Sequence, residues 1–326
     1  MIPRVSSRFL RRIGQIGMLA LAIGLTPAVH ANAYPDRPIE LVVPTSPAGG
    51  TDVLARLFAD AARKQLPQSM VIVNRPGAAG AIGMRSVVTA PPDGYRVAMI
   101  IAAWAILPSL GEANWTANDF KYVARINEDP AAITVRSDAP WKTVEEFLAD
   151  AKKRPGQISI GNVGVGSIYH FAAAALEDMT GLKFSHIPFQ GANPAVTALL
   201  GGHINAVAVS PAEVSAHVAS GKFRVLAVMS EKRVKGFENI PTLTEKQIPL
   251  AIGTWRGLTV PKNTPDAVVT VLRDATRKAM ADPEFQAGLD KANLGFAYLD
   301  GPEFHTFAEK NFQYFKQLAG KIDLKP

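Results

Sequence analysis

The sequence predicts an α/β protein with two domains, and three observations support this class. Strand-length apolar runs alternate with helical patterns along most of the chain, which is typical of parallel sheets covered by helices on both faces. The chain has 326 residues and is 48% hydrophobic, as expected for a globular protein of one large domain or two ordinary ones. The number of alternating units favours two.

The first elements alternate clearly. Apolar runs predict strands at 39–43, 70–73 and 96–101. Between the first two strands, the segment 51–66 predicts a helix that ends before Pro67. The apolar residues on one face of this helix are Val53, Leu54, Leu57, Phe58, Ala61 and Ala62. A glycine-rich loop and a short helix follow the second strand.

The later elements follow the same rule. Thr143 and Glu146 form a T-x-x-E capping box for a helix through Lys153. Asn193-Pro194 predicts the cap and first turn of a helix that ends at Gly201-Gly202. Further strands are predicted at 132–135, 158–160, 204–209 and 224–229, and further helices from Thr264-Pro265 and over 302–319.

The N-terminal segment predicts export. It contains four arginines and no acid before a short apolar stretch, and it ends in Ala31-Asn32-Ala33. A basic start, an apolar middle and an A-x-A end are typical of a signal peptide, here residues 1–33 with cleavage near Ala33. The alternative is a transmembrane anchor, but the apolar run is short and interrupted by glycines and a proline.

Charge and cysteine content exclude several classes of function. Removing the four arginines lowers the formal net charge from +7 to about +3. The remaining basic clusters are short and typical of solvated surface, so nucleic-acid binding is not expected. The chain has no cysteine, which excludes disulfides, thiol catalysis, cysteine metal sites and a lipid-attachable cysteine. An exported chain of this length then relies on its core.

Three loops between strands and helices are rich in small residues: PTSPAGGTD (44–52), NRPGAAG (74–80) and NVGVGS (162–167). In open α/β sheets, ligands bind at such loops beyond the carboxyl ends of strands. Unpaired N–H groups at helix starts favour an anion, and small residues let the backbone approach it. The loops match no nucleotide motif and no G-x-S-x-G nucleophile turn, so no cofactor is expected.

Ser167 and His170 raise the question of a nucleophile and its base. On a helix that starts at Ser167, the two residues share a face. A hydrolase also needs an acid to orient the histidine and an oxyanion hole, and no nearby carboxylate is a clear candidate. The sequence favours a binding loop in which Ser167 caps the helix and offers its hydroxyl or N–H to a ligand. It predicts no enzyme.

Other candidate residues each have a simpler structural interpretation. Asp52 is a candidate site acid, but its place in a first helical turn also fits capping. Trp104 either lines a pocket or packs in the core, and Trp255 either marks the passage back into the first domain or fills core. The histidines at 186, 203, 217 and 305 show no metal-binding spacing, so no metal site is expected.

Several segments after residue 33 form a specific combination, although no single one is specific. In chain order they are YPDRPIELVVPTSPAGGTDVLAR, NRPGAAGAIG followed by APPDGYR, GVGSIYH, HIPFQGANPAVTALLGGHI, GKFRVLAV and PTLTE. Together they resemble the periplasmic substrate-binding receptors of tripartite tricarboxylate transporters, often called Bug-type receptors. The resemblance covers nearly the whole mature chain.

The resemblance implies a two-lobed periplasmic binding protein fold of type II, with two crossover strands and the ligand in the interdomain cleft. Lobe 1 would comprise residues 34–132 and 254–326, and lobe 2 residues 133–253. A small carboxylate would be held mainly by backbone N–H groups and hydroxyls rather than by an arginine clamp. Closure would then signal occupancy to the membrane subunits of a tripartite tricarboxylate-type transporter.

The resemblance also assigns ligand contacts to both lobes. Those expected from lobe 1 are Thr45, Ser46, Ala48, Gly49, Thr51, Asp52, Ala78, Ala79 and Gly80, with Trp104 as a further candidate. Those expected from lobe 2 are Asn162, Val165, Gly166, Ser167, His170, Gln190 and Gly191. A monomer in the periplasm is expected. Two other functions stay open: a ligand sensor that reports to a sensor kinase, and an exported serine hydrolase.

The sequence departs from the family pattern at several of these positions. Ala48 and Ala79 stand where the family has glycines, and Asn162 stands where a serine is common. Phe189-Gln190 replaces the usual Tyr-Lys, which removes a positive charge at the cleft rim, and Asn205 replaces an aspartate. These changes leave open a less charged or bulkier ligand.

Overall fold

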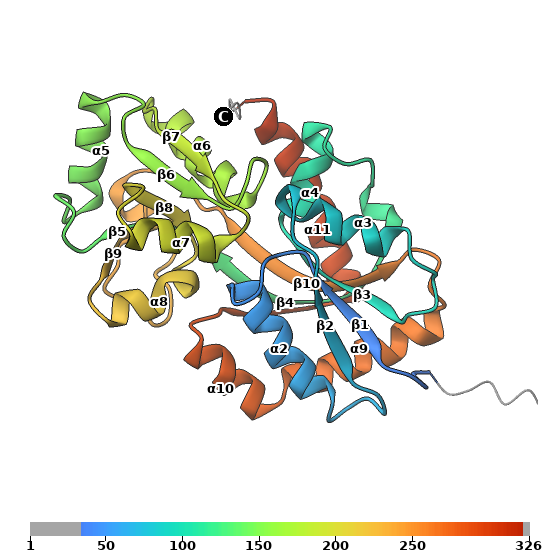
Figure 1. The fold of residues 1–326 in the computed structure, drawn as a ribbon. Coiled ribbons are helices and arrows are strands. Elements are labelled where there is room, and N and C mark those ends of the chain that lie inside the picture. Colours follow the sequence, from blue (N-terminus) through green and yellow to red (C-terminus); the bar gives the residue numbers. More distant parts are fainter. Residues whose placement is uncertain (1–33, 322–326) are drawn as a thin grey trace, which may run out of the picture. The chain divides into compact units, whose positions relative to one another are not determined.

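The computed structural model describes residues 34–321, and in this part of the chain eleven strands form two sheets (Figure 1). The predicted signal peptide lies outside the described residues. The six-stranded sheet has the order β11 (Phe296–Asp300), β4 (Phe120–Pro130), β10 (Gly253–Pro261), β3 (Arg96–Ile101), β1 (Ile39–Val43) and β2 (Met70–Asn74). The five-stranded sheet has the order β7 (Ser185–Pro188), β6 (Ser159–Asn162), β8 (Ala206–Val209), β5 (Ala132–Arg136) and β9 (Phe223–Val228). We call the parts built on these sheets the first and second lobes.

Helices cover the sheets of both lobes (Figure 1). The first lobe contains α2 (Gly50–Ala62), α3 (Ala81–Val88), α4 (Ala103–Ile106), α9 (Asp266–Met280), α10 (Pro283–Lys291) and α11 (Gly301–Ala319), with the short helices η1 (Ala78–Gly80), η2 (Leu107–Leu110) and η3 (Ala117–Asp119). The second contains α5 (Val144–Lys153), α6 (Ile168–Thr180), α7 (Ala192–Leu200) and α8 (Pro211–Ala219), and η4 (Thr244–Lys246) follows β9. Within the described residues, no helix combines the length and apolar character needed to cross a membrane.

The sheets are mixed, so the expectation of parallel sheets was only partly right. Strand β1 pairs in parallel with β2 and β3, and β6 pairs in parallel with β7 and β8. In contrast, β10 is antiparallel to β3 and β4, and β5 is antiparallel to β8 and β9. The antiparallel strands are those by which the chain leaves one sheet or returns to it, so the local β-α alternation does not set their direction.

The chain crosses between the lobes twice, and the two crossings lie side by side. The first runs from β4 through Ala131 into β5, and the second leads from β9 back to β10. The Ala131 amide donates to the Ile252 carbonyl at 2.9 Å, and the Met229 amide donates to the Ala131 carbonyl at 2.7 Å. The two crossing segments are the chain connections between the sheets, and these hydrogen bonds hold them to each other.

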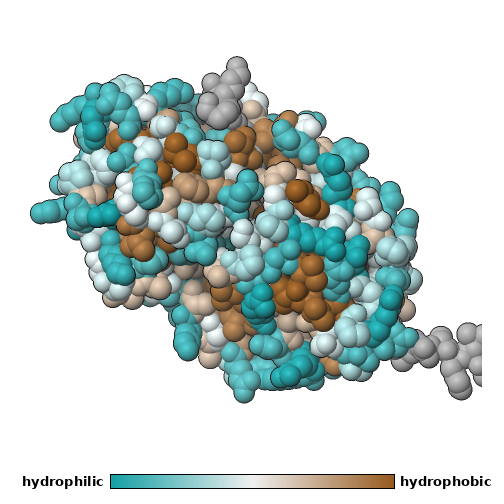
Figure 2. Space-filling view, in the orientation of Figure 1, coloured by the Kyte–Doolittle hydropathy of each residue, from teal (hydrophilic) through white to brown (hydrophobic). Residues whose placement is uncertain are grey.

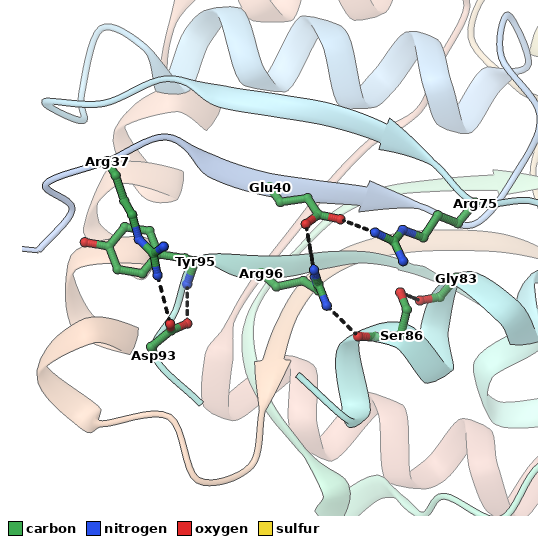
Figure 3. A network of polar contacts seen from close by, with 8 residues as sticks. All are labelled: Arg37, Glu40, Arg75, Gly83, Ser86, Asp93, Tyr95 and Arg96. Carbon is green, nitrogen blue, oxygen red and sulfur yellow. Dashed lines mark hydrogen bonds and ion pairs between the residues drawn. The ribbon is translucent and has the colours of Figure 1, made fainter. Parts of the chain in front are cut away.

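Ion pairs and caps fix individual elements. Glu40 on β1 accepts from Arg75 after β2 and from Arg96 on β3, at 2.9 and 3.0 Å, and so ties three neighbouring strands (Figure 3). The predicted capping box of α5 is confirmed, because the Thr143 hydroxyl accepts from the Glu146 amide at 3.3 Å and the Glu146 carboxylate accepts from the Thr143 amide.

The predicted start of α7 was wrong by two residues. The helix begins at Ala192 with Gly191 as its cap, so Asn193 and Pro194 lie inside the first turn. Pro194 is tolerated there because a first-turn N–H has no helical partner to lose. Gly191 has φ +135°, a conformation that favours glycine and ends the preceding loop.

The cores lie on both faces of the six-stranded sheet and around the five-stranded one. Trp104 and Trp255 belong to an aromatic cluster with ring centroids 6.4 Å apart, and they are 0% and 2% exposed. Both fill core, and Trp255 also lies on returning strand β10. The face in Figure 2 is largely hydrophilic, with a hydrophobic patch over the region of β1, β2 and β3.

Candidate functional site

A cavity of about 520 Å³ lies between the loops of the two lobes. Its walls come from the segments that follow β1, β2 and β3 in the first lobe, and β6, β7 and β8 in the second. These are carboxyl ends of parallel strands, where ligands of α/β proteins bind. The floor includes Thr254 and Arg256 of β10.

Contacts between the lobes close two sides of this cavity. The Ser46 hydroxyl donates to the Gln190 carbonyl oxygen at 2.6 Å. On the other side, the Gly50 amide donates to Oε2 of Glu213 at 2.8 Å. The first lobe therefore contacts the loop that precedes α7 and the helix α8.

The start of α2 is already filled by two carboxylates. Glu213 accepts from the Gly50 amide, and Asp52 accepts from the Ala48 amide at 3.0 Å. Asp52 also accepts from Arg56 and Asn74. Burial acts to raise the pKa of Asp52, but these hydrogen bonds outweigh it and hold the pKa below its usual value. Asp52 stays charged and stabilises the loop and helix start rather than facing the cavity.

Three alanines adopt left-handed backbone in the first-lobe loops. Ala48, Ala78 and Ala79 have φ of +63°, +46° and +50°. Such angles are uncommon for residues with a Cβ and cluster at functional sites. Ala48 and Ala79 are the positions at which the family resemblance leads us to expect glycine. The geometry explains why glycine is suited there, and two of the methyls, those of Ala78 and Ala79, belong to residues that line the cavity.

The start of α6 is filled by its own residues. The Ser167 hydroxyl accepts from the His170 amide at 3.2 Å, and Nδ1 of His170 accepts from the Gly166 amide at 3.3 Å. Burial lowers the pKa of His170 to about 4, so the ring is neutral at pH 7. Ser167 bonds to the backbone of His170 and not to its ring, so the two side chains are not arranged as nucleophile and base. The Asn162 side chain accepts from the Gly164 amide.

The start of α7 differs, because no side chain caps it. Gly191, Ala192 and Asn193 all line the cavity. The first N–H groups of a helix have no intrahelical partner, and together with the helix dipole they attract an anion. This start is open to a ligand where those of α2 and α6 are not.

A buried charged network forms the floor and was missed by the sequence analysis. Arg256 is 1% exposed and donates to Thr51, Asn127 and Asp129, at 2.9, 2.5 and 2.5 Å. Its Nη2 lies 3.5 Å from Oε1 of Glu213. The available signals were an arginine within the apolar run GTWRGLTV, and an acid just beyond the carboxyl end of a predicted strand.

The ionisation of this network follows from burial and mutual attraction. Burial raises the pKa of Glu213, although Arg256 and the Gly50 amide favour its charged form. Burial alone would lower the pKa of Arg256, but Asp129 and other neighbours outweigh it and raise that pKa. Because its Nε and Nη1 donate to protein acceptors and its Nη2 lies beside Glu213, Arg256 is not a free clamp for a ligand.

Two residues that line the cavity have buried hydroxyls without a hydrogen bond of normal geometry. Tyr169 is 4% exposed, and within the described residues neither its hydroxyl nor that of Thr45 makes such a bond, although the Ser210 hydroxyl lies close to that of Tyr169. Buried polar groups are rarely left unsatisfied. These hydroxyls are thus candidates for contact with a bound molecule. Tyr169 was not singled out from the sequence.

The structure brings most of the predicted contact residues to one cavity. Those that line it are Thr45, Ser46, Gly49, Thr51, Ala78, Ala79, Gly80, Val165, Ser167, Gln190 and Gly191. Those that do not are Ala48, Asp52, Trp104, Asn162, Gly166 and His170. Apart from Trp104, which packs in the core, members of the second group support the loops through hydrogen bonds.

Comparisons with known proteins agree with this architecture. Residues 54–324 match the model of the tripartite tricarboxylate transporter family receptor. A protein of Cupriavidus necator, the UPF0065 protein in the gbd 5′ region, is 34% identical over 320 residues, which is 97% of each chain. A TctC solute-binding protein from Polaromonas, solved with no ligand, is 52% identical with a TM-score of 0.69, over 88% of this chain and 99% of that one.

A third relative was solved with a ligand. The R. palustris protein Rpa4515, solved with adipate, is 25% identical with a TM-score of 0.84, over 89% of this chain and 99% of that one. The family model spans most of the described residues, and two lobes joined by crossover strands enclose a cavity in this chain. The chain belongs to the tripartite tricarboxylate transporter receptor family.

Proposed function

We propose that the protein is a periplasmic receptor that binds a small organic acid between its lobes and delivers it to the membrane subunits of a tripartite tricarboxylate-type transporter. The observation that carries this proposal is the cavity between the two lobes, with the uncapped start of α7 on its wall. In this proposal the first lobe comprises residues 34–132 and 254–326, and the second lobe comprises residues 133–253.

The ligand contacts of this proposal combine main-chain amides and hydroxyls. The amides of Ala192 and Asn193 face the ligand carboxylate, and the hydroxyls of Ser46, Thr45 and Tyr169 surround it. Hydrogen bonds to a carboxylate are charge-assisted and stronger than neutral ones. The buried arginine of the floor, Arg256, does not act as a clamp, because Asp129 already pairs with it.

Closure of the lobes on the ligand is part of the proposal. The relative solved with no ligand has the lower TM-score to this chain although its identity is the higher, and the relative solved with adipate has the higher TM-score. This order is expected if the present arrangement is closed, because hinge closure moves one lobe relative to the other and so lowers the superposition with an open relative. The contacts Ser46–Gln190 and Gly50–Glu213 would break on opening.

Ligand identification tests the proposal. Protein purified under native conditions is denatured and its small molecules are identified by mass spectrometry, and mono- and dicarboxylates are screened by thermal shift beside their uncharged amides. We expect at least one carboxylate to raise Tm while its amide does not. Stabilisation by no carboxylate, together with turnover of an ester that Ser167→Ala abolishes, would overturn the receptor assignment.

Delivery is tested separately in cells. Deletion of the gene should abolish uptake of the identified acid, and a plasmid copy should restore it. Uptake that is unchanged while a transcriptional response to the acid is lost would replace transport by signalling.

A further inference from the structure

The start of α2 has the sequence of an anion site but no room for an anion. The Gly50 amide points at Glu213, whose side chain is 7% exposed. A Cβ built on Gly50 would lie 2.8 Å from Oε1 of Glu213 and 3.2 Å from Nη2 of Arg256. A ligand carboxylate at this helix start would therefore have to displace the Glu213 carboxyl group, whether that group is charged or protonated.

The second observation is that different parts of the cavity offer different polar groups to a ligand. The start of α7 is uncapped and lines the cavity, and the buried Tyr169 hydroxyl beside the floor makes no hydrogen bond of normal geometry, with only the Ser210 hydroxyl close to it. One charged group can be held at the amides of α7. A neutral or weakly polar group suits the end near Tyr169, because a hydroxyl satisfies it without bringing a second negative charge close to Glu213.

A large part of the remaining wall is apolar. It is formed by Ile101, Leu107, Leu110, Val163, Ile168 and Phe189, from both lobes. Burying a ligand against such side chains is favourable in proportion to the apolar area removed from water. A cavity of about 520 Å³ has room for a ring or a chain of several methylenes beside a carboxylate.

We propose that Glu213 is a specificity-determining residue that occupies the second anion position of the cavity, so that the receptor selects monocarboxylates with an apolar body over dicarboxylates. This inference rests on the proposed function and narrows it to a ligand class. A second ligand carboxylate near α2 would have to displace the Glu213 carboxyl group, and where that group is charged the two like charges also repel. Selectivity then comes from exclusion as much as from attraction.

The test compares hexanoate with adipate, which have six carbons and differ by one carboxylate. Isothermal titration calorimetry at pH 7.5 on the purified full mature chain measures both dissociation constants. We expect the wild type to bind hexanoate at least about tenfold more tightly than adipate. Glu213→Ala frees the Gly50 amide and one side of Arg256, so the ratio should shift at least about tenfold towards adipate.

Glu213→Gln separates the effect of the Glu213 charge from the effect of the space that its side chain fills beside the Gly50 amide. Its amide oxygen can still accept from the Gly50 amide, so the shift towards adipate should be smaller than for Glu213→Ala. This variant also serves if Glu213→Ala fails to fold, as checked by thermal unfolding. The matched control is Glu284→Gln, which removes an exposed carboxylate that pairs with Lys64 and does not line the cavity, and which should leave the ratio within about twofold.

The outcomes are distinct. A wild type that prefers adipate, or variants at Glu213 that weaken both ligands equally, would overturn the inference and leave Glu213 a structural residue. Failure of both probes to bind the wild type would also overturn it. The receptor function itself would fail only if the wider thermal-shift screen found no stabilising carboxylate.

Discussion

The starts of α2 and α7 look alike in sequence but differ in the folded protein. Both have a glycine as their N-cap, in a loop that follows a strand, and both line the cavity. At α2, the Gly50 amide is taken by Glu213 from the other lobe, whereas at α7 no side chain caps the helix. The same local pattern thus gives an occupied position on one wall and an open one on the other.

The difference shows that an anion site depends on its tertiary neighbours as well as on its helix. Small residues and a helix dipole make both starts suitable for a carboxylate. The protein supplies its own carboxylate to α2, and α6 is filled similarly by Ser167 and His170. Only the comparison of all three starts indicates where a ligand has room.

The largest effect on stability is expected at Arg256, which contacts Thr51 at the start of α2 and both carboxylates of the floor network, Asp129 and Glu213. Arg256→Met leaves Asp129 and Asn127 buried without their cation, and removing one partner of a buried pair costs about 3–5 kcal/mol of unfolding free energy. Urea denaturation measures this. The control Arg277→Met removes the exposed pair with Asp274 and should cost less than about 1 kcal/mol. Equal losses for the two variants would show that the floor network does not stabilise the α2 side.

The next effect is a pH dependence at the α6 start. Burial lowers the pKa of His170 from its ordinary 6.5 to about 4, so the unfolded chain binds this proton more readily than the folded one. The stabilisation is complete above pH 6.5 and is lost as the pH falls towards 4, by roughly 3 kcal/mol.

Unfolding free energies of the wild type and His170→Gln, measured from pH 4 to 8, test this. His186 and Glu177 near the ring are present in both proteins, so the difference between the two curves isolates His170. We expect that difference to be constant above pH 7 and to narrow on acidification. Parallel curves down to pH 4 would mean that the ring is not held neutral, and that Gly166 is not its donor.

The sequence was sufficient for elements whose signal is local. The buried runs at 39–43, 70–73 and 96–101 became β1, β2 and β3, and the Thr143–Glu146 box caps α5. The direction of β10 was not accessible from alternation, because the chain reaches it from the other lobe. The two crossover strands were expected from the family resemblance and not from residue patterns.

The site was predictable as loops but not as a set of partners. The three small-residue loops do meet at one cavity. The loops after β1 and β2 lie together because parallel strands end on the same edge of their sheet, whereas the loop after β6 comes from the other sheet. Glu213 and Arg256 were missed because their roles arise from contacts with Gly50 and Asp129, far away in sequence. No periodicity or spacing reports such contacts.

A smaller effect is expected at the open start of α7. Gly191→Ala places a methyl group about 3.3 Å from Oγ of Ser46, in a backbone region that costs about 2 kcal/mol for a residue with a Cβ. Because the methyl group also disturbs the amides of α7, hexanoate affinity should fall about tenfold. The control Gly181→Ala has a positive φ with open space around it, so it should lose about 1 kcal/mol of stability and no affinity.

The smallest effect compares two serine- or threonine-capped helices. Ser167→Ala and Thr143→Ala each remove an N-cap and should each cost about 1 kcal/mol in urea denaturation. Thr143 is not among the cavity residues, so only Ser167→Ala should weaken hexanoate binding, by about threefold, the value of one ordinary hydrogen bond. A loss far above tenfold would make α6 the anchor of the ligand in place of α7, and the contrast between an open and two filled helix starts would then have to be redrawn.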